Sequence, residues 1–289
     1  MKVLVLGATG LLGNAMFRVL SENSDGDVYG TVRSAEVKKL FAQPQVGQRL
    51  VLTGDLENHD HLVRLFDTIR PDVVVNCTAV GKMASLDPVR SISIYALLPH
   101  RLAQLCKIGK ARLIHFSSDG VFSGKTGGYT EEDVADASDL YGLSKILGEV
   151  RDPHAITLRT SIIGHELQTR GGLLEWFLSQ QDRCKCYARA IFSGFPAVVL
   201  AQVIRDVVLP RPDLNGVFHV ATKPISKCEL LSLVAQQYKK PITIVPDDKV
   251  IIDRSLNADR FREATGYVPP GWPELVHRMH SYQFGLARQ

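Results

Sequence analysis

The sequence lacks the features that mark membrane proteins and nucleic-acid-binding proteins. No apolar run reaches the roughly 20 residues of a membrane-spanning helix, and glycine interrupts the first apolar run at Gly7. Neither sign of charge predominates, because 34 Lys and Arg are nearly balanced by 30 Asp and Glu, for a net charge of +4. We therefore expect a cytoplasmic protein with no membrane partner, no nucleic-acid partner and no cleavable signal.

Cysteine is present, but without a recognisable pattern. The five cysteines are odd in number and irregularly spaced, which does not indicate a disulfide framework. Cys184 and Cys186 form a lone C-x-C with no second Cys or His pair at zinc spacing, so no metal site is predicted. With 289 residues, 45% of them hydrophobic, the chain has the length and composition of one large or two modest globular domains.

What the sequence does contain is a regular alternation of short apolar strands and helical patterns. Strands are predicted at residues 2–6, 27–32, 49–53, 71–76, 112–116 and 154–159, and helices at 14–20, 59–69 and 88–107. Strands that alternate with helices through short connections are typical of a doubly wound parallel sheet, a Rossmann-type α/β fold. Such sheets bind ligands at the carboxyl ends of their strands.

A glycine-rich turn lies directly after the first strand. Gly7, Gly10 and Gly13 follow the strand and open a helical pattern, which is the context that a dinucleotide-binding motif requires. Glycines let backbone N–H groups approach a pyrophosphate, and the helix N-terminus favours its negative charge. The spacing G-x-x-G-x-x-G differs from that of many dehydrogenases, and a simple tight turn is the alternative.

The residue at the end of the second strand bears on the choice of coenzyme. An acidic residue there would bind the ribose 2′-hydroxyl of NAD, whereas an arginine accommodates a 2′-phosphate. The sequence has Arg33 at this place, so NADPH is predicted in preference to NADH. The alternative is that Arg33 is a solvated residue at a strand end.

The segment from Ser117 to Lys145 contains a plausible group for proton transfer. Tyr141 and Lys145 are four residues apart on a helical pattern and would share one face of the helix. A nearby ammonium lowers the pKa of a phenol, and a serine such as Ser118 can orient a substrate oxygen. By itself the Tyr-x-x-x-Lys pattern is more often an ordinary amphipathic helix face.

Beyond residue 160 the alternation loosens. Helices are predicted at 172–181, 196–209, 226–238, 256–265 and 273–282, and strands at 216–220 and 241–246, with Ser226 and Glu229 spaced as a capping box. We expect residues 1–160 to form the dinucleotide-binding domain with the Ser/Tyr/Lys group. Residues 161–289 would then form mainly a small substrate-binding lobe, with some segments returning to the sheet.

The motifs together resemble the extended short-chain dehydrogenase/reductase family. Within it they are most similar to the dTDP-4-dehydrorhamnose reductases and related nucleotide-sugar 4-keto reductases. The resemblance covers nearly the whole chain and rests on GATGLLG, GDL at 54–56, FSSDGVFSG, GGYTEEDVADASDLYGLSK, LRTSIIG at 158–164 and the segment DRSLNADRFREATGYVPPGWPELV. It implies reduction of a keto sugar by NADPH in deoxysugar or surface-polysaccharide precursor synthesis.

The resemblance also implies roles for individual residues. Tyr141 would protonate the substrate oxygen, Lys145 would lower the Tyr141 pKa and hold the nicotinamide ribose, and Ser118 would take the place of the catalytic Ser/Thr. The implied coenzyme-binding residues are Gly7, Thr9, Gly10, Leu11, Leu12, Gly13, Arg33, Asp55, Leu56, Thr78, Ala79, Val80, Ser117, Tyr141 and Lys145. The implied substrate-binding residues are Ser118, Asp119, Gly120, Tyr141 and Ile162.

Three positions depart from the family pattern. Gly120 stands in place of a tyrosine and Ile162 in place of a tryptophan, so two rings near the sugar are lost and the sugar pocket should be reshaped. Tyr95 stands in place of an asparagine, where it either disturbs a proton relay or simply packs.

Three functional hypotheses follow. The first is the NADPH-dependent 4-keto reductase, and the second is an epimerase or dehydratase of the same fold that keeps its coenzyme. The third is a coenzyme-binding regulatory subunit without chemistry of its own. The sugar, the nucleotide and the stereochemistry of the product are left open, and so is a homodimer.

Overall fold

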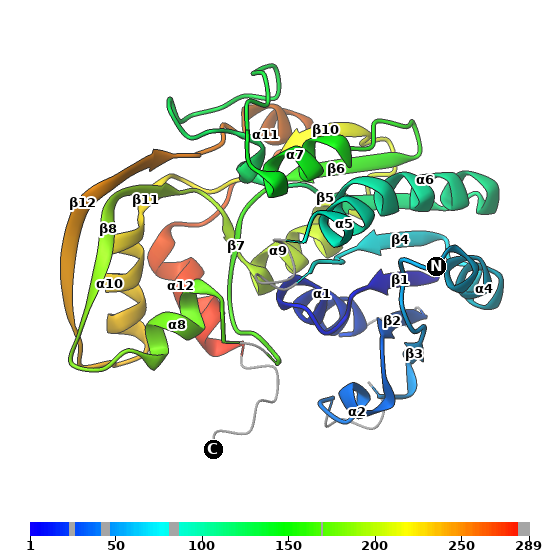
Figure 1. The fold of residues 1–289 in the computed structure, drawn as a ribbon, viewed down its shortest axis with the longest axis horizontal. Coiled ribbons are helices and arrows are strands. Elements are labelled where there is room, and N and C mark those ends of the chain that lie inside the picture. The colour runs from blue at the N-terminus through cyan, green and yellow to red at the C-terminus, as the bar shows by residue number, and fades with distance from the viewer. Residues whose placement is uncertain (23–26, 42–46, 81–86, 169, 283–289) are drawn as a thin grey trace.

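Two sheets of different kinds organise the molecule. The computed structural model describes residues 1–22, 27–41, 47–80, 87–168 and 170–282, and Figure 1 shows them as a larger sheet with helices and a smaller lobe beside it. The larger sheet has seven strands in the order β10-β6-β5-β4-β1-β2-β3, and every neighbouring pair is parallel. Its strands are β1 (Val3–Leu6), β2 (Val28–Val32), β3 (Leu50–Leu52), β4 (Val73–Asn76), β5 (Arg112–Phe116), β6 (Ala155–Arg159) and β10 (Gly216–His219).

Helices cover both faces of this sheet, which explains why its strands are apolar on both sides. Along β1, Val3 and Val5 join one core cluster, whereas Leu4 and Leu6 join the other. The first face is covered by α1 (Leu11–Ser21), α9 (Ala197–Val203) and η4 (Ile204–Val208), and α12 (Trp272–Ser281) packs on α9. The second face is covered by α4 (His59–Ile69), α5 (Pro88–Ser91), the π-helical segment η2 (Ile92–Leu97) and α6 (Leu98–Gly109).

The smaller lobe is built around a three-stranded sheet. Its strands are β11 (Ile225–Ser226), β8 (Arg183–Phe192) and β12 (Thr243–Asp253), with β12 parallel and β11 antiparallel to β8. The helices α8 (Leu173–Ser179), α10 (Lys227–Gln237) and α11 (Asp259–Thr265) belong to the same half of the chain. The short strands β7 (Ile162–Ile163) and β9 (Phe195–Pro196) pair with each other. The remaining elements are α2 (Ala35–Lys38), α7 (Leu140–Leu147) and the 3₁₀ turn η3 (Asp119–Val121).

The predicted fold class is confirmed, since the strand order is that of a doubly wound parallel sheet. The predicted capping box is also present, because Ser226 Oγ accepts from Glu229 N and the Glu229 carboxylate accepts from Ser226 N. The C-terminal half returns to the main sheet through β10 and α9. The functional division at residue 160 stays a prediction.

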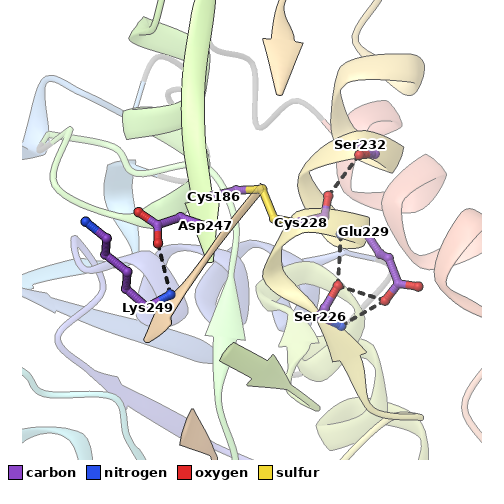
Figure 2. Close-up of a disulfide and its surroundings, with 7 residues drawn as sticks. All are labelled: Cys186, Ser226, Cys228, Glu229, Ser232, Asp247 and Lys249. Carbon is purple, nitrogen blue, oxygen red and sulfur yellow. Dashed lines mark hydrogen bonds between the residues drawn. A yellow bond between two sulfur atoms is a disulfide. The ribbon is translucent and has the colours of Figure 1, made fainter. Parts of the chain in front are cut away.

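Three expectations for the second half need correction. The strand predicted at 241–246 extends to Asp253, and β8 was not predicted although its sequence alternates buried and exposed residues. One disulfide is present where no framework was expected, between Cys186 of β8 and Cys228 of α10 (Figure 2), with their Cα atoms 5.2 Å apart. The two cysteines are 42 residues apart in sequence, so only the packing of α10 on β8 brings them together.

Among the described residues, no helix is both long and apolar enough to cross a membrane.

Candidate active site

The glycine turn after β1 allows an unusually close approach of backbone segments. Gly7 has a φ of +75°, and a Cβ at this position would lie 2.9 Å from the Cys77 carbonyl oxygen at the end of β4. A Cβ on Gly13 would overlap the Gly7 carbonyl group. Because both residues are glycines, the first turn of α1 packs directly against the loop between β1 and α1, and this loop packs against the end of β4. The helix N-terminus with its free N–H groups therefore opens at the carboxyl edge of the sheet.

A cavity of about 540 Å³ runs along this edge. Eleven of the expected coenzyme-binding residues line it, and they come from the ends of several strands: Gly7, Thr9, Gly10, Leu11, Arg33, Asp55, Leu56, Thr78, Ala79, Val80 and Tyr141. The cavity therefore joins the glycine turn to the proposed proton donor.

The other four expected coenzyme-binding residues do not line the cavity. Leu12 is buried in the core and Gly13 packs on Gly7. Ser117 Oγ donates to Glu149 Oε1 at 2.9 Å, and Lys145 Nζ donates to the Phe116 carbonyl oxygen at 3.0 Å. Contact of these four residues with a coenzyme stays a prediction.

The sequence analysis missed the opposite wall of this cavity. The segment between β7 and α8 contributes Glu166, Leu167, Gln168, Gly171 and Gly172, and Gly172 N donates to Glu166 Oε2 at 2.7 Å. No motif marks this segment, because its contribution depends on where the chain returns after β7. Arg90 and Glu57 also line the cavity, and their side chains form an ion pair of 3.6 Å.

Arg33 lies at the end of β2, as expected, and its side chain is exposed at the cavity. In the described part of the chain, no hydrogen bond or ion pair engages its guanidinium group. A cation held at this place without a protein partner is suited to an anionic ligand group.

The Ser/Tyr/Lys group is brought together by α7 and the end of β5. Asp139 caps α7 by accepting from Gly142 N at 2.9 Å, which places Tyr141 in the first turn and Lys145 one turn later. Ser118 caps η3 by accepting from Gly120 N at 2.9 Å. Ser118 Oγ and the Tyr141 ring lie side by side at Gly120, where an added Cβ would be 3.1 Å from Ser118 Oγ and 2.9 Å from Tyr141 Cε1, so the two hydroxyl groups can meet one substrate oxygen.

The expected lowering of the Tyr141 pKa is wrong for this structure. Burial raises the pKa of Tyr141, and the hydrogen bond from Ser118 opposes this only in part. The Lys145 ammonium binds the Phe116 carbonyl and faces the Tyr95 ring. Burial also lowers the pKa of Lys145 to about 8, against the opposing charge of Glu149.

Glu149 holds the elements that carry the Ser/Tyr/Lys group, and its role was not predicted from the sequence. Its carboxylate accepts two hydrogen bonds from the Arg159 guanidinium, at 2.7 and 2.8 Å, and both side chains are almost fully buried. A buried pair with bidentate geometry holds its partners in one arrangement. Because Glu149 also binds Ser117, it links the ends of β5 and β6 to α7.

The expected substrate residues lie beside Tyr141, with one exception. Burial raises the pKa of Asp119, and Arg254 and Lys227 are the nearby cations that oppose it. A Cβ on Gly120 would lie 2.9 Å from Tyr141 Cε1, so the missing side chain leaves room for the Tyr141 ring. Ile162 lies in β7 and packs against the core on the α1 face, and its contact with a substrate stays a prediction.

A second cavity, of about 680 Å³, lies in the lobe. It shares Gly171 with the first cavity and also contains Lys227, whose charge acts on Asp119. The other lining residues come from α8, β8, α10 and β12: Leu173, Trp176, Gln180, Arg183, Cys184, Lys185, Cys186, Tyr187, Leu231 and Asp247. With Lys227, the cavity has three cationic side chains, one carboxylate (Asp247) and two aromatic rings, and this excess of positive charge suits an anionic ligand with a planar group.

Comparisons with known proteins agree with this geometry. A family model described as RmlD substrate binding domain matches residues 1–252. A Haloferax volcanii protein named probable low-salt glycan biosynthesis reductase Agl14 is 34% identical over 278 residues, which cover 91% of this chain and 87% of that protein. Methionine adenosyltransferase 2 subunit beta from Danio rerio is 29% identical, over 83% of this chain and 75% of its own length.

A solved structure shares the fold. The dTDP-4-dehydrorhamnose reductase of Bacillus anthracis in complex with NADP superposes with a TM-score of 0.80. The match covers 97% of each chain at 21% sequence identity.

Proposed function

The chain belongs to the RmlD substrate binding domain family, and from this premise we propose that it is an NADPH-dependent reductase of a nucleotide-linked 4-keto-6-deoxy sugar. One observation carries the proposal. Tyr141 lies in the wall of the cavity that begins at the glycine turn, and its ring and the Ser118 hydroxyl group lie together beside Gly120. Reduction of a ketone requires a proton donor beside the site that holds the hydride donor.

The cavity fits the proposed coenzyme. The glycine turn leaves a backbone cradle that a Cβ at Gly7 or Gly13 would fill, and the N-terminus of α1 opens onto it. Arg33, exposed at the end of β2, would bind the 2′-phosphate of NADPH. The Bacillus anthracis relative of this fold was solved with NADP, which supports the same choice. When bound, NADPH supplies the hydride for the ketone carbon.

The residues of the chain would supply the remaining chemistry. Tyr141 donates its proton to the ketone oxygen, so hydride and proton together convert C=O to CH–OH and NADPH to NADP⁺. Ser118 holds the same oxygen through its hydroxyl group, and the positive charge of Lys145 favours the phenolate that Tyr141 becomes. Glu149 keeps Ser117 and α7 in register through its bond with Arg159.

The lobe cavity would hold the nucleotide part of the substrate. Its basic residues suit a diphosphate, and a sugar attached to that diphosphate would extend toward Asp119, on which the charge of Lys227 in this cavity acts. The departures at Gly120 and Ile162 predict a sugar pocket that differs from that of the family. The name of the Haloferax volcanii relative supports a role in glycan biosynthesis.

The experiment is a screen of 4-keto nucleotide sugars, beginning with dTDP-4-dehydrorhamnose, in which NADPH oxidation is followed by absorbance. We expect one sugar to be reduced with one NADPH consumed per alcohol formed. Turnover without net NADPH consumption would favour the epimerase or dehydratase. If NADPH binds but no keto sugar is reduced, the regulatory subunit becomes the better hypothesis, as the name of the Danio rerio relative would suggest.

We also propose a homodimer. Exposed apolar side chains gather on neighbouring helical segments, with Val89 on α5, Ile92 on η2, and Leu143 and Leu147 on α7. Exposed apolar patches often mark protein interfaces. Light scattering should give the mass of a dimer for the native protein and of a monomer for Leu143→Glu combined with Leu147→Glu. A monomeric native protein would contradict this assembly.

The cytoplasmic location also remains a proposal, to be tested by cell fractionation. The Cys186–Cys228 disulfide weighs against it, because disulfides are rare in reducing compartments.

A further inference from the structure

Tyr95 occupies a position between the coenzyme cavity and the proposed catalytic group. It lies in the π-helical segment η2, its side chain is 4% exposed, and it lines the cavity. A Cβ on Gly148 would overlap the Tyr95 carbonyl oxygen, so η2 and the end of α7 approach each other at backbone distance. Short π-helical stretches are frequent at functional sites because they place a side chain that a regular helix would turn away.

The Tyr95 ring contacts both Lys145 and Tyr141. The Lys145 ammonium lies 4.7 Å from the centre of the ring. The Tyr141 ring meets it edge-on, with centroids 5.2 Å apart and planes at 86°. A cation over an aromatic face is attracted by the ring quadrupole, and this attraction is stronger at a buried site than at an exposed one. The edge-on contact restricts the tilt of the Tyr141 ring.

The Tyr95 hydroxyl group ties this contact to the cavity wall. It accepts from Val80 N at 3.1 Å and donates to Val80 O at 3.2 Å. Val80 follows β4 and lines the coenzyme cavity. Tyr95 therefore touches the cavity wall with its hydroxyl group and the Lys145–Tyr141 pair with its ring.

Three other groups act directly on the Lys145 ammonium. The Phe116 carbonyl accepts its hydrogen bond, Glu149 one turn later favours its charge, and Cys77 has a smaller effect of the same sign. His115 on β5 is buried, and the Lys145 charge lowers its pKa, so it stays neutral. Since burial lowers the Lys145 pKa to about 8, the protein needs favourable contacts to keep this ammonium charged.

We propose that Tyr95 is a positioning residue whose ring keeps Lys145 charged and Tyr141 aligned beside the coenzyme cavity. The inference rests on the proposed coenzyme site and does not depend on which sugar is reduced. The asparagine that the family resemblance implied at this position could not provide such a contact. The sequence left two alternatives for Tyr95, disturbance of a proton relay or simple packing. In this proposal the ring packs, and its packing also has an electrostatic effect on Lys145.

The test measures NADPH affinity by coenzyme fluorescence across the pH range around the Lys145 pKa. A charged Lys145 favours NADPH, so affinity should fall as pH rises through about 8 in the native protein. Lys145→Gln should abolish this fall of affinity with pH, called the pH step below, which would assign the step to Lys145. Tyr95→Leu should move the step to lower pH by about one unit, since a desolvated cation–π contact is worth roughly that much.

Two further variants separate the ring from its hydroxyl group and from general packing. Tyr95→Phe keeps the ring, so the step should stay in place while affinity falls at every pH through loss of the Val80 contacts. Tyr267→Leu removes a ring that packs on Phe195 and Phe261 and does not line the coenzyme cavity, and it should leave the step unmoved. The proposal is overturned if Tyr95→Leu only weakens binding without moving the step, or if the step survives in Lys145→Gln.

Discussion

The two sheets of this protein hold their residues in different ways. The strands of the main sheet are three to five residues long and are covered on both faces. In the lobe, β8 and β12 are 10 and 11 residues long, β8 alternates buried with exposed residues, and no residue of β12 is classed as buried. The main sheet therefore fixes its ligand edge by close packing, whereas the lobe sheet has an open face.

The disulfide fits this difference. It joins β8 to the first turn of α10, next to the capping box formed by Ser226 and Glu229 (Figure 2). The main sheet has no such link among its described residues, since Cys77 and Cys106 are free and buried. The covalent link therefore contributes mainly to the stability of the lobe.

The largest expected effect belongs to the main sheet. Tyr141→Phe removes the proposed proton donor and should lower kcat by about 10²–10⁴-fold, the usual loss for an acid–base group. NADPH affinity should change little, because the ring stays in place. Tyr267→Phe is the matched control, because Tyr267 does not line the coenzyme cavity, and its kcat should stay within about twofold of the native value. Equal activity of the two variants would remove the proposed role of Tyr141.

The next effect belongs to the lobe. Replacing Cys186 and Cys228 by serine opens a loop with a sequence separation of 42, which should lower the free energy of unfolding by about 4 kcal/mol in the chain-entropy model. Denaturant unfolding would measure this, and the reduced native protein should match the double variant. NADPH affinity should be unchanged in both. If affinity falls with stability, the two regions are not as separate as the comparison holds.

A smaller effect is expected at Gly120. Ala at this position places a Cβ about where Tyr141 Cε1 needs room, at 2.9 Å, and should displace the ring. Displacement of a catalytic group by about 1 Å costs about 10²-fold in kcat. Gly109→Ala is the control, since a Cβ there meets no atom within 4 Å. Steady-state kinetics would show a loss in kcat for Gly120→Ala alone, and unchanged kcat would mean that the ring has other room.

The smallest effect concerns coenzyme choice. Arg33→Ala should weaken NADPH binding by about tenfold, as expected for loss of one charge-assisted contact, and should leave NADH binding unchanged. Fluorescence titration with both coenzymes would measure the ratio. A parallel loss for both coenzymes would assign Arg33 to the shared part of the dinucleotide.

The main sheet could be predicted further from sequence than the lobe could, for a physical reason. Its strands are continuous apolar runs bounded by turns, and Gly7 and Gly13 are required by local geometry. In the lobe, β8 reads as alternating charged and small residues, and the length of β12 depends on pairing with β8. Pairing between strands so distant in sequence has no local signature.

Within the candidate site, the glycine turn, the strand ends and the spacing of Tyr141 and Lys145 could be predicted from the sequence, because they depend on neighbours a few residues away. Tertiary packing alone brings Glu149 to Arg159 and Ser117, residues 166–168, 171 and 172 to the cavity wall, and Lys145 to the Tyr95 ring. It also decided the pKa of Tyr141, which burial raises against the expectation from its neighbour. Such contacts and burial arise when distant segments pack together, and no local pattern of residues encodes them.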